Sequence, residues 1–234
     1  MITCYRDEQH LYLRQDFNEL VDIIHQEREQ GFFITDFDYG NGIYSVVLEK
    51  GCEFKDQKLT WESEFTPSKV TDFWDEGFDL TNLFFDGSDW IYVFSLVEKS
   101  LGQCWVSDAE FPTEKIDEKW KEGYVITKVA YGQGMWVVVF SKGIDYDNTN
   151  WMTRTQIDFD ELREKISQGK MITEIAYGAG LWCIVFSSIS VYTFQRVVQS
   201  VDYPIDRVQE LWKDGCAGLL CAYGANMWAI VMSK

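Results

Sequence analysis

Residues 123–142 read GYVITKVAYGQGMWVVVFSK, and the same pattern returns at a fixed spacing along the chain. Residues 169–188 read GKMITEIAYGAGLWCIVFSS, and residues 215–234 read GCAGLLCAYGANMWAIVMSK. More divergent copies are GFFITDFDYGNGIYSVVLEK at 31–50 and GFDLTNLFFDGSDWIYVFSL at 77–96. The step between copies is 46 residues, with no insertion or deletion. A constant period of this kind is the signature of a repeat protein, so we predict five copies of one structural unit.

Three columns of equivalent residues fix the period. They are Gly31, Gly77, Gly123, Gly169 and Gly215; Tyr44, Trp90, Trp136, Trp182 and Trp228; and Tyr39, Phe85, Tyr131, Tyr177 and Tyr223. We therefore predict a single domain over residues 1–234. Its approximate units, called the first to fifth repeats below, are 1–51, 52–97, 98–143, 144–189 and 190–234.

The hydrophobic period changes within each repeat. Residues 111–123 (FPTEKIDEKWKEG) space Phe111, Ile116 and Trp120 as on a helix that ends at Gly123, with Thr113 as the expected N-cap. Residues 124–131 and 135–141 then alternate as two strands joined by a tight turn at 132–134. A less regular strand precedes each helix, as at 104–109 and 151–156. The expected fold class is α+β, with five strand–helix–strand–strand repeats.

The last strand of each repeat is apolar on both faces, as residues 136–140 (WVVVF) illustrate. Strands of this kind are covered on both sides. An open solenoid needs end units with polar outer faces, and the last repeat is among the most apolar. The sequence therefore favours a closed, pseudo-fivefold ring that resembles an α/β-propeller, with an open solenoid or a five-bladed β-propeller variant as alternatives.

Composition limits the classes of function. The chain has 234 residues, is 46% hydrophobic and carries a formal charge of −17. Such a charge repels nucleic-acid phosphates and anionic lipid, so we expect no direct nucleic-acid or membrane binding, and a protein partner with a basic surface. The first ten residues lack the features of a secretory signal, and the six cysteines show no zinc spacing. A soluble protein of the reducing cytoplasm, without metal or cofactor, is expected.

The pattern W-x-x-G-Y-x-I-T-x-x-A-Y-G-x-G-x-W, carried by Trp120 to Lys142 and again by Trp212 to Lys234, resembles an uncharacterised repeat. That repeat is found in the C-terminal region of plant casein-kinase-I-like kinases and in stand-alone ciliate and bacterial proteins. The resemblance implies an accessory or interaction module of unknown function and supplies no catalytic residues. The predicted ring also looks like the propeller architecture of the pentein superfamily, by analogy of topology alone.

The repeat provides an internal control for candidate catalytic residues. Cys183, Cys216 and Cys221 share columns with apolar residues and are predicted to be buried, whereas Cys104 is predicted to be exposed. His25 is expected on the solvated face of a helix, and His10 in a turn. No cysteine or serine is paired with a histidine by the pattern, so we expect no enzyme.

Two columns are polar within otherwise apolar strands. Asp36, Asn82, Lys128 and Glu174 differ in every repeat, which suggests either a binding position or a sheet edge or channel lining that contacts water. The serine column is explained by hydroxyls that cap the backbone at strand ends. Its members are Ser95, Ser141, Ser187 and Ser233, with Glu49 in the first repeat.

Acidic residues are concentrated in the first two repeats. Residues 1–97 carry 20 acidic and 7 basic side chains, against 18 and 14 in residues 98–234. The candidate partner-binding residues are Asp72, Asp75, Glu76, Asp86 and Asp89. Asp86 and Asp89 replace turn glycines of other repeats, and we expect that the turn does not require their charge, so that reversing both to Lys changes the melting temperature little. The leading hypothesis is a non-enzymatic protein-interaction or scaffold module. The alternatives are a pentein-like small-molecule enzyme with an axial site, and an acidic nucleic-acid mimic that inhibits a basic protein.

Overall fold

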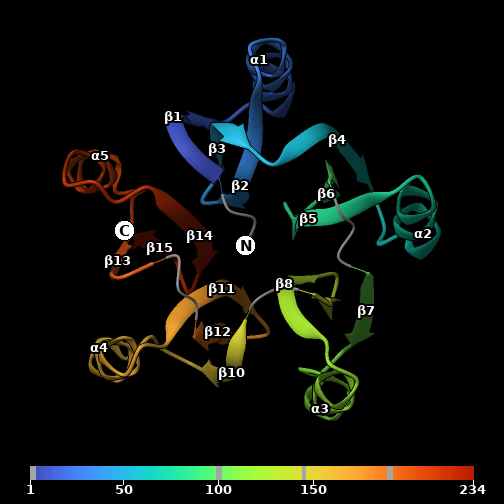
Figure 1. The fold of residues 1–234 in the computed structure, drawn as a ribbon, viewed down its shortest axis with the longest axis vertical. Coiled ribbons are helices and arrows are strands. Elements are labelled where there is room, and N and C mark those ends of the chain that lie inside the picture. Colours follow the sequence, from blue (N-terminus) through green and yellow to red (C-terminus); the bar gives the residue numbers. More distant parts are fainter. Residues whose placement is uncertain (1–3, 99–101, 144–145, 189–191) are drawn as a thin grey trace. The chain divides into compact units, whose positions relative to one another are not determined.

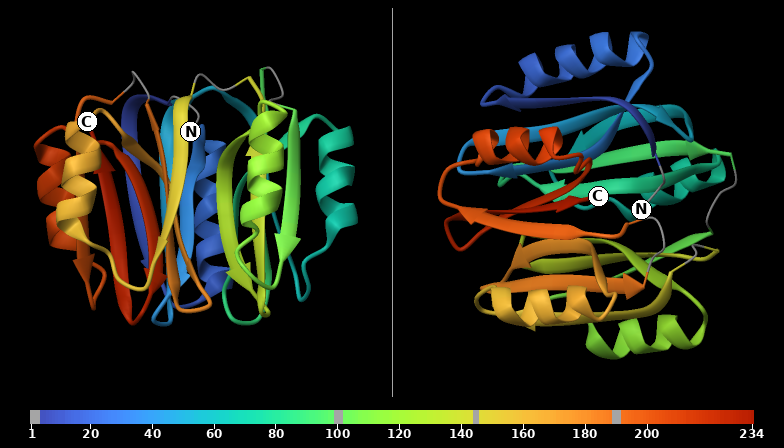
Figure 2. Two further views of the ribbon diagram at one scale, coloured as in Figure 1. Left: turned by 90° about the horizontal axis from the view of Figure 1, so that it is seen from below. Right: turned by 60° about the vertical axis from the view of Figure 1, so that its left-hand side comes forward.

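The computed structural model describes residues 4–98, 102–143, 146–188 and 192–234, without the side chains of residues 4–7 and 148. The chain forms two compact units, Met1–Ile144 and Asp145–Lys234. The first unit contains three repeats and the second contains two (Figures 1 and 2). We call them the N-terminal and C-terminal units.

Every repeat follows the order strand, helix, strand, strand. The N-terminal unit contains β1 (Cys4–Arg14), α1 (Phe17–Glu29), β2 (Phe32–Gly40), β3 (Ile43–Cys52), β4 (Phe54–Glu62), α2 (Pro67–Asp75), β5 (Phe78–Phe85), β6 (Trp90–Val97), β7 (Gln103–Asp108), α3 (Thr113–Lys121), β8 (Val125–Gly132) and β9 (Met135–Ser141). The C-terminal unit contains β10 (Asp147–Arg154), α4 (Phe159–Ser167), β11 (Met171–Gly178), β12 (Leu181–Ser188), β13 (Gln195–Ser200), α5 (Ile205–Lys213), β14 (Gly218–Gly224) and β15 (Met227–Ser233).

Each repeat folds into one antiparallel sheet of three strands in which the last strand lies in the middle. The order is β1-β3-β2 in the first repeat, and the other four sheets follow the same plan (Figure 1). These five sheets and five helices of the described residues confirm the α+β class and the five predicted repeats. Ring closure and a single domain stay predictions. The repeat boundaries predicted between residues 143 and 144 and between residues 189 and 190 involve residues that the structure does not describe.

The middle strands are buried on both faces, as their apolar sequence predicts. Trp136 to Phe140 of β9 are all 0% exposed. In the first, second and fourth repeats, one face of the middle strand packs on the helix of its own repeat and on the following sheet. In the second repeat, Tyr92 and Phe94 of β6 cluster with Val70 of α2 and with Val137 of the third repeat.

The helix ends follow ordinary capping rules with one correction. Asp16 and Asp158 cap α1 and α4 through their carboxylates. The predicted cap Thr113 is instead the first residue of α3, and Pro112 takes the cap position without a side-chain hydrogen bond. Each helix is followed by a glycine with a φ of 80° to 89°, which ends the helix at the same point in every repeat.

A β-bulge interrupts the second strand of the first four repeats. In the first repeat the register shifts between Ile34 and Asp36, so Thr35 has no partner residue on β3. Equivalent shifts occur at Thr81, Thr127 and Thr173. In the first three repeats the threonine hydroxyl bonds back to the middle strand, as from Thr81 Oγ1 to the carbonyl oxygen of Val93 at 3.2 Å. The hydroxyl of Thr173 has no hydrogen-bond partner among the described residues. The fifth repeat has Leu219 at this position and a continuous register. The bulge therefore explains the threonine column.

Candidate functional site

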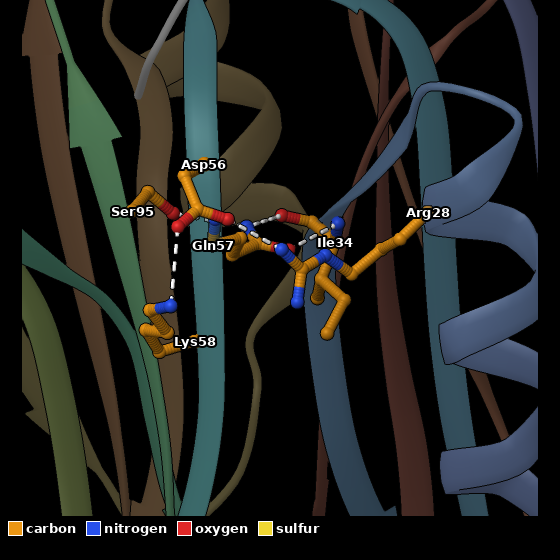
Figure 3. A network of polar contacts seen from close by, with 6 residues as sticks. All are labelled: Arg28, Ile34, Asp56, Gln57, Lys58 and Ser95. Atoms are coloured by element: carbon orange, nitrogen blue, oxygen red, sulfur yellow. Dashed lines mark hydrogen bonds and ion pairs between the residues drawn. The ribbon is translucent and has the colours of Figure 1, made fainter.

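A glutamine on the first strand of a repeat binds the preceding repeat. The Oε1 of Gln57 on β4 accepts a hydrogen bond from the backbone nitrogen of Ile34 at 2.8 Å, and its Nε2 donates to the Ile34 carbonyl at 2.9 Å. The same Nε2 lies 2.9 Å from Ser95 Oγ on β6 (Figure 3). Gln57 is 1% exposed. Its amide therefore satisfies both backbone groups of Ile34 beside the bulge.

This bridging glutamine recurs in both units. Gln103 contacts Leu80 and Ser141 in the same way, and Gln195 contacts Ile172 and Ser233. Two repeats depart from the pattern: Thr149 bonds to Ser187 at 3.2 Å, and Gln9 bonds to Glu49. Our sequence analysis missed these glutamines, although Gln57 and Gln103 are spaced by the same 46 residues as the other columns.

The serine column has a different role from the one predicted. The hydroxyls of Ser95 and Ser141 bond to the bridging glutamines and to Thr81 and Thr127, at 2.7 Å and 3.0 Å from the threonine oxygens. They therefore bind side chains rather than cap backbone groups. Because these contacts support the fold, the column supplies no nucleophile oriented toward a ligand.

An ion-pair network lies beside the first bridging glutamine. Arg28 Nη2 of α1 lies 2.5 Å from Asp56 Oδ1 of β4, and Lys58 Nζ lies 3.2 Å from Asp56 Oδ2 (Figure 3). Hydrogen bonds and these two cations lower the pKa of Asp56, although partial burial opposes the shift. The network links α1 of the first repeat to β4, the first strand of the second repeat.

The divergent polar column of Asp36, Asn82, Lys128 and Glu174 lies on edge strands, which agrees with the interpretation of these residues as a sheet edge. Asp36, Asn82 and Lys128 follow the bulges of β2, β5 and β8, and Glu174 holds the same position on β11. All four side chains are at most 8% exposed, so the expected contact with water is wrong. The buried Oδ1 of Asn82 accepts no hydrogen bond from the described residues. A binding role stays a prediction.

Glu174 lies close enough to Tyr146 and Cys183 to affect both of them electrostatically. Burial raises the pKa of the Tyr146 phenol, and Tyr192 and Glu174 raise it further. Burial and Glu174 also raise the pKa of the Cys183 thiol. Cys183 is therefore held as a neutral thiol, which does not favour a nucleophilic role.

The five acidic candidates do not form one cluster. Asp72, Asp75 and Glu76 are exposed at the C-terminal end of α2, whereas Asp86 and Asp89 are half-buried in the β5–β6 turn. The eight-residue strand β5 separates Glu76 from Asp86, which corresponds to roughly 26 Å at ~3.3 Å per residue. A single surface that contains all five is therefore not available.

The premise that the β5–β6 turn does not need its charges is wrong. Asp86 Oδ1 accepts hydrogen bonds from the backbone nitrogens of Ser88 and Asp89 at 2.8 Å and 2.7 Å. Its Oδ2 accepts one from the Tyr44 hydroxyl at 2.6 Å. Asp86 therefore builds the turn and ties it to the first repeat. Reversal of Asp86 and Asp89 is expected to lower stability, contrary to the sequence-based expectation.

Both histidines are accounted for. His25 is exposed on α1, as predicted. His10 lies in β1 and not in a turn, because β1 extends through Arg14. Its Nδ1 lies 2.9 Å from Oε2 of the buried Glu27, and its ring stacks on Phe32 at 4.3 Å between centroids. The Tyr12 hydroxyl donates to Glu27 Oε1 at 2.6 Å. No pattern in the sequence indicates this cluster, because it depends on contacts between α1 and β1.

The cysteines mostly follow the internal control. Cys183, Cys216 and Cys221 are at most 3% exposed, as predicted. Cys104 is half-buried rather than exposed, and burial raises the pKa of its thiol. Cys52 is disulfide-bonded, a state that does not support the predicted reducing compartment. Cellular location stays a prediction.

The described part of the chain lacks two kinds of feature. Within it, no group of three or more His, Cys, Asp and Glu side chains is placed to hold a metal ion. None of its helices combines the length and the apolar character that crossing a membrane requires.

The comparisons with known proteins agree with the repeat architecture. A family model described as a domain of unknown function (DUF7477) matches residues 3–133 and again residues 130–234. The chain belongs to this family. The two matches together cover nearly the whole sequence as tandem copies. A search of curated proteins gives no match.

Proposed function

We propose that this DUF7477 chain is a protein-interaction module that binds a basic partner protein through the C-terminal end of α2. One observation carries the proposal. Asp72, Asp75 and Glu76 are exposed there, and the last turn of α2 contains no basic residue. The helix macrodipole already places partial negative charge at this end, so these carboxylates cost stability. Residues that oppose stability in an otherwise consistent fold suggest a functional requirement.

The other helices supply a comparison within the same molecule. Their last turns carry basic residues, namely Arg28 in α1, Lys119 and Lys121 in α3, Lys165 in α4 and Lys213 in α5. Asp75 stands at the position of Lys121 and Lys213. The same position holds Glu29 in α1, but α1 also carries Arg28, and α2 alone among these five helices has no basic residue in its last turn. That difference supports recognition, rather than stability, as the reason for Asp75.

We also propose that the five repeats close into a ring, which would present this surface on a rigid scaffold. The third strand in each sheet order packs on its equivalent in the next repeat, and it does so in both units. The pairs are β2 with β5, β5 with β8, and β11 with β14. Small-angle X-ray scattering tests closure. A compact chain of this length has a radius of gyration of about 17 Å, and a clearly larger value would indicate an open array.

The interaction proposal is tested on a partner that the wild-type chain captures from its native source and that mass spectrometry identifies. With this partner purified, Asp72→Lys with Asp75→Lys should slow association by at least about tenfold and reduce its salt dependence, because electrostatic steering acts on the association rate. Glu118→Lys changes an equally exposed carboxylate on α3 and serves as the control. Equal association rates for both variants and the wild type would refute the α2 surface.

A further inference from the structure

The C-terminal unit contains an open groove of about 640 Å³ between α4 and β13. Phe159, Leu162 and Ile166 of α4 line one wall, and residues 194–199 line the other. Sites that bind ligands occupy roughly 300–1,000 Å³. The groove therefore has the capacity for several side chains of a partner.

Ile166 explains why the groove is open. In the equivalent gap of the second repeat, Trp74 Nε1 of α2 donates to Gln103 Oε1 on β7 at 3.0 Å. In the first repeat, Arg28 crosses the gap to Asp56. The 46-residue step places Ile166 at the position of Trp74. Isoleucine has no polar group to bond to the next strand and is much smaller than tryptophan, so this gap remains unfilled.

The groove follows a free sheet edge. β13 is an outer strand in the order β13-β15-β14. Phe194 and Lys234 exchange both backbone hydrogen bonds, at 3.2 Å and 2.9 Å. Since bonded and non-bonded pairs alternate in antiparallel sheets, the backbone groups of Val197 and Gln199 point away from β15. Among the described residues these groups bond to no other strand. Such an edge can pair with an added strand.

Three arginines line the same groove: Arg163, Arg196 and Arg207. Arg163 pairs with Asp160 at 2.7 Å, and Arg207 pairs with Glu210 at 2.6 Å, each within its own helix. Exposed ion pairs of this kind contribute little to stability. Arg196 lies 5.8 Å from the ring of Phe194, which is 39% exposed, and has no ion pair within the described residues. This positive cluster occurs in a chain of net charge −17, so it differs from the average surface.

We propose that the groove binds an acidic, extended peptide segment of a partner protein, which adds as a strand to the free edge of β13. Because side chains alternate along a strand, the peptide's carboxylates pair with Arg196 on one face, and its apolar side chains contact Phe159 and Val197 on the other. Arg163 adds positive charge on the α4 wall. The six residues of β13 set the length of the bound segment. The free edge of β13 favours a polypeptide over a nucleic acid, because strand addition uses backbone N–H and C=O groups of a peptide chain. The inference concerns a different surface from α2 and does not depend on it.

The test uses the full chain and a fluorescein-labelled peptide Val-Glu-Val-Glu-Val-Glu with blocked ends, followed by fluorescence anisotropy. We expect saturable binding that weakens with added salt. Ile166→Trp should fill the groove and weaken binding at least tenfold, whereas Gln209→Ala, a change at an exposed residue of α5 outside the groove, should leave binding unchanged. Val197→Pro removes an outward N–H from an edge strand, a position that tolerates proline, and should also weaken binding at least tenfold.

Each outcome decides the proposal. Arg163→Glu with Arg196→Glu should abolish binding of the acidic peptide, and this surface variant replaces Ile166→Trp if the latter does not fold. No saturable binding of the peptide at millimolar concentration would overturn the proposal. Binding that survives both Ile166→Trp and the double charge reversal would place the peptide elsewhere and would also overturn it. Asp75→Lys should not affect this peptide, so the result is separate from that of the α2 surface.

Discussion

The Tyr44 hydroxyl donates a 2.6 Å hydrogen bond to Asp86 Oδ2, across the contact between the first and second repeats. Each residue is the exception in its column, since the other repeats have tryptophan and glycine at these positions. A Cβ added at Gly132 would overlap Cβ of Phe85 and lie 2.8 Å from Cζ2 of Trp90, so the glycine makes room for two aromatic side chains of the preceding repeat. In the first repeat Tyr44 replaces the tryptophan and supplies a hydroxyl donor to Asp86.

The pair should therefore behave as one unit in stability measurements. Tyr44→Phe removes a hydrogen bond to a carboxylate and should cost about 1.5–3 kcal/mol. Adding Asp86→Gly to Tyr44→Trp restores the residues of the other repeats, so the double variant should be more stable than the sum of the two single changes predicts. Urea unfolding of the four proteins measures this coupling. Additive effects would show that the two residues act independently.

The bridging glutamine should contribute more than a surface glutamine. Gln57→Ala leaves the buried backbone groups of Ile34 without their partners, and the expected loss is roughly 3 kcal/mol. Gln209→Ala changes an exposed glutamine of α5 and is the control. Chemical denaturation provides the measurement. If both variants lost the same small amount, the bridge would not stabilise the contact between repeats.

The repeat and its elements could be predicted because they depend on local patterns. The strand predicted at 135–141 coincides with β9, and that predicted at 124–131 differs from β8 by one residue at each end. Aromatic and glycine columns are visible because the period is constant. Periodicity also reports burial on both faces, which is why the middle strands were recognised.

The contacts between repeats could not be predicted, because they depend on register. The β-bulge at Thr35 moves Asp36 into a buried position, and no hydrophobic pattern shows that shift. The role of Asp86 depends on Tyr44, which lies 42 residues earlier in the sequence. The α4–β13 groove depends on one absent tryptophan, and the signal for it was the Trp74 column that our sequence analysis did not compare.

The buried tryptophan column should dominate the stability of the core. Trp136 is 0% exposed, and Trp136→Ala should cost roughly 3–5 kcal/mol through loss of contacts and a cavity. Cys221→Ala removes a smaller group and should be mild, with function intact. Thermal unfolding compares the two variants. A folded Cys221→Ala protein that had lost all partner binding would contradict the structural role given to this cysteine.

The acidic end of α2 should lower stability while it serves binding. Asp75→Lys places a positive charge where the macrodipole is negative, so stability should rise by about 0.3–1 kcal/mol at low salt. Lys121→Asp makes the opposite change at the same position of α3 and should destabilise by a similar amount. Both effects should decrease in high salt, which denaturant titration at two ionic strengths measures. A loss of stability in Asp75→Lys would show that Asp75 is structural.

Tyr12 predicts a specific sensitivity to alkaline pH. Burial and then the hydrogen bond to Glu27 raise the pKa of its phenol from 10.0 to about 12. Because the folded-state pKa lies above the unfolded value, the neutral phenol contributes stability that is fully present below pH 10 and is lost as the pH rises from 10 to about 12. Tyr12→Phe cannot ionise and also loses the bond to Glu27, so it should be less stable at pH 8 but show a smaller decline above pH 10. Urea midpoints measured from pH 8 to 11.5 test this. Parallel declines in both proteins would mean that Tyr12 does not control the alkaline transition, and that the cluster of Glu27 with His10 and Tyr12 persists without the phenol proton.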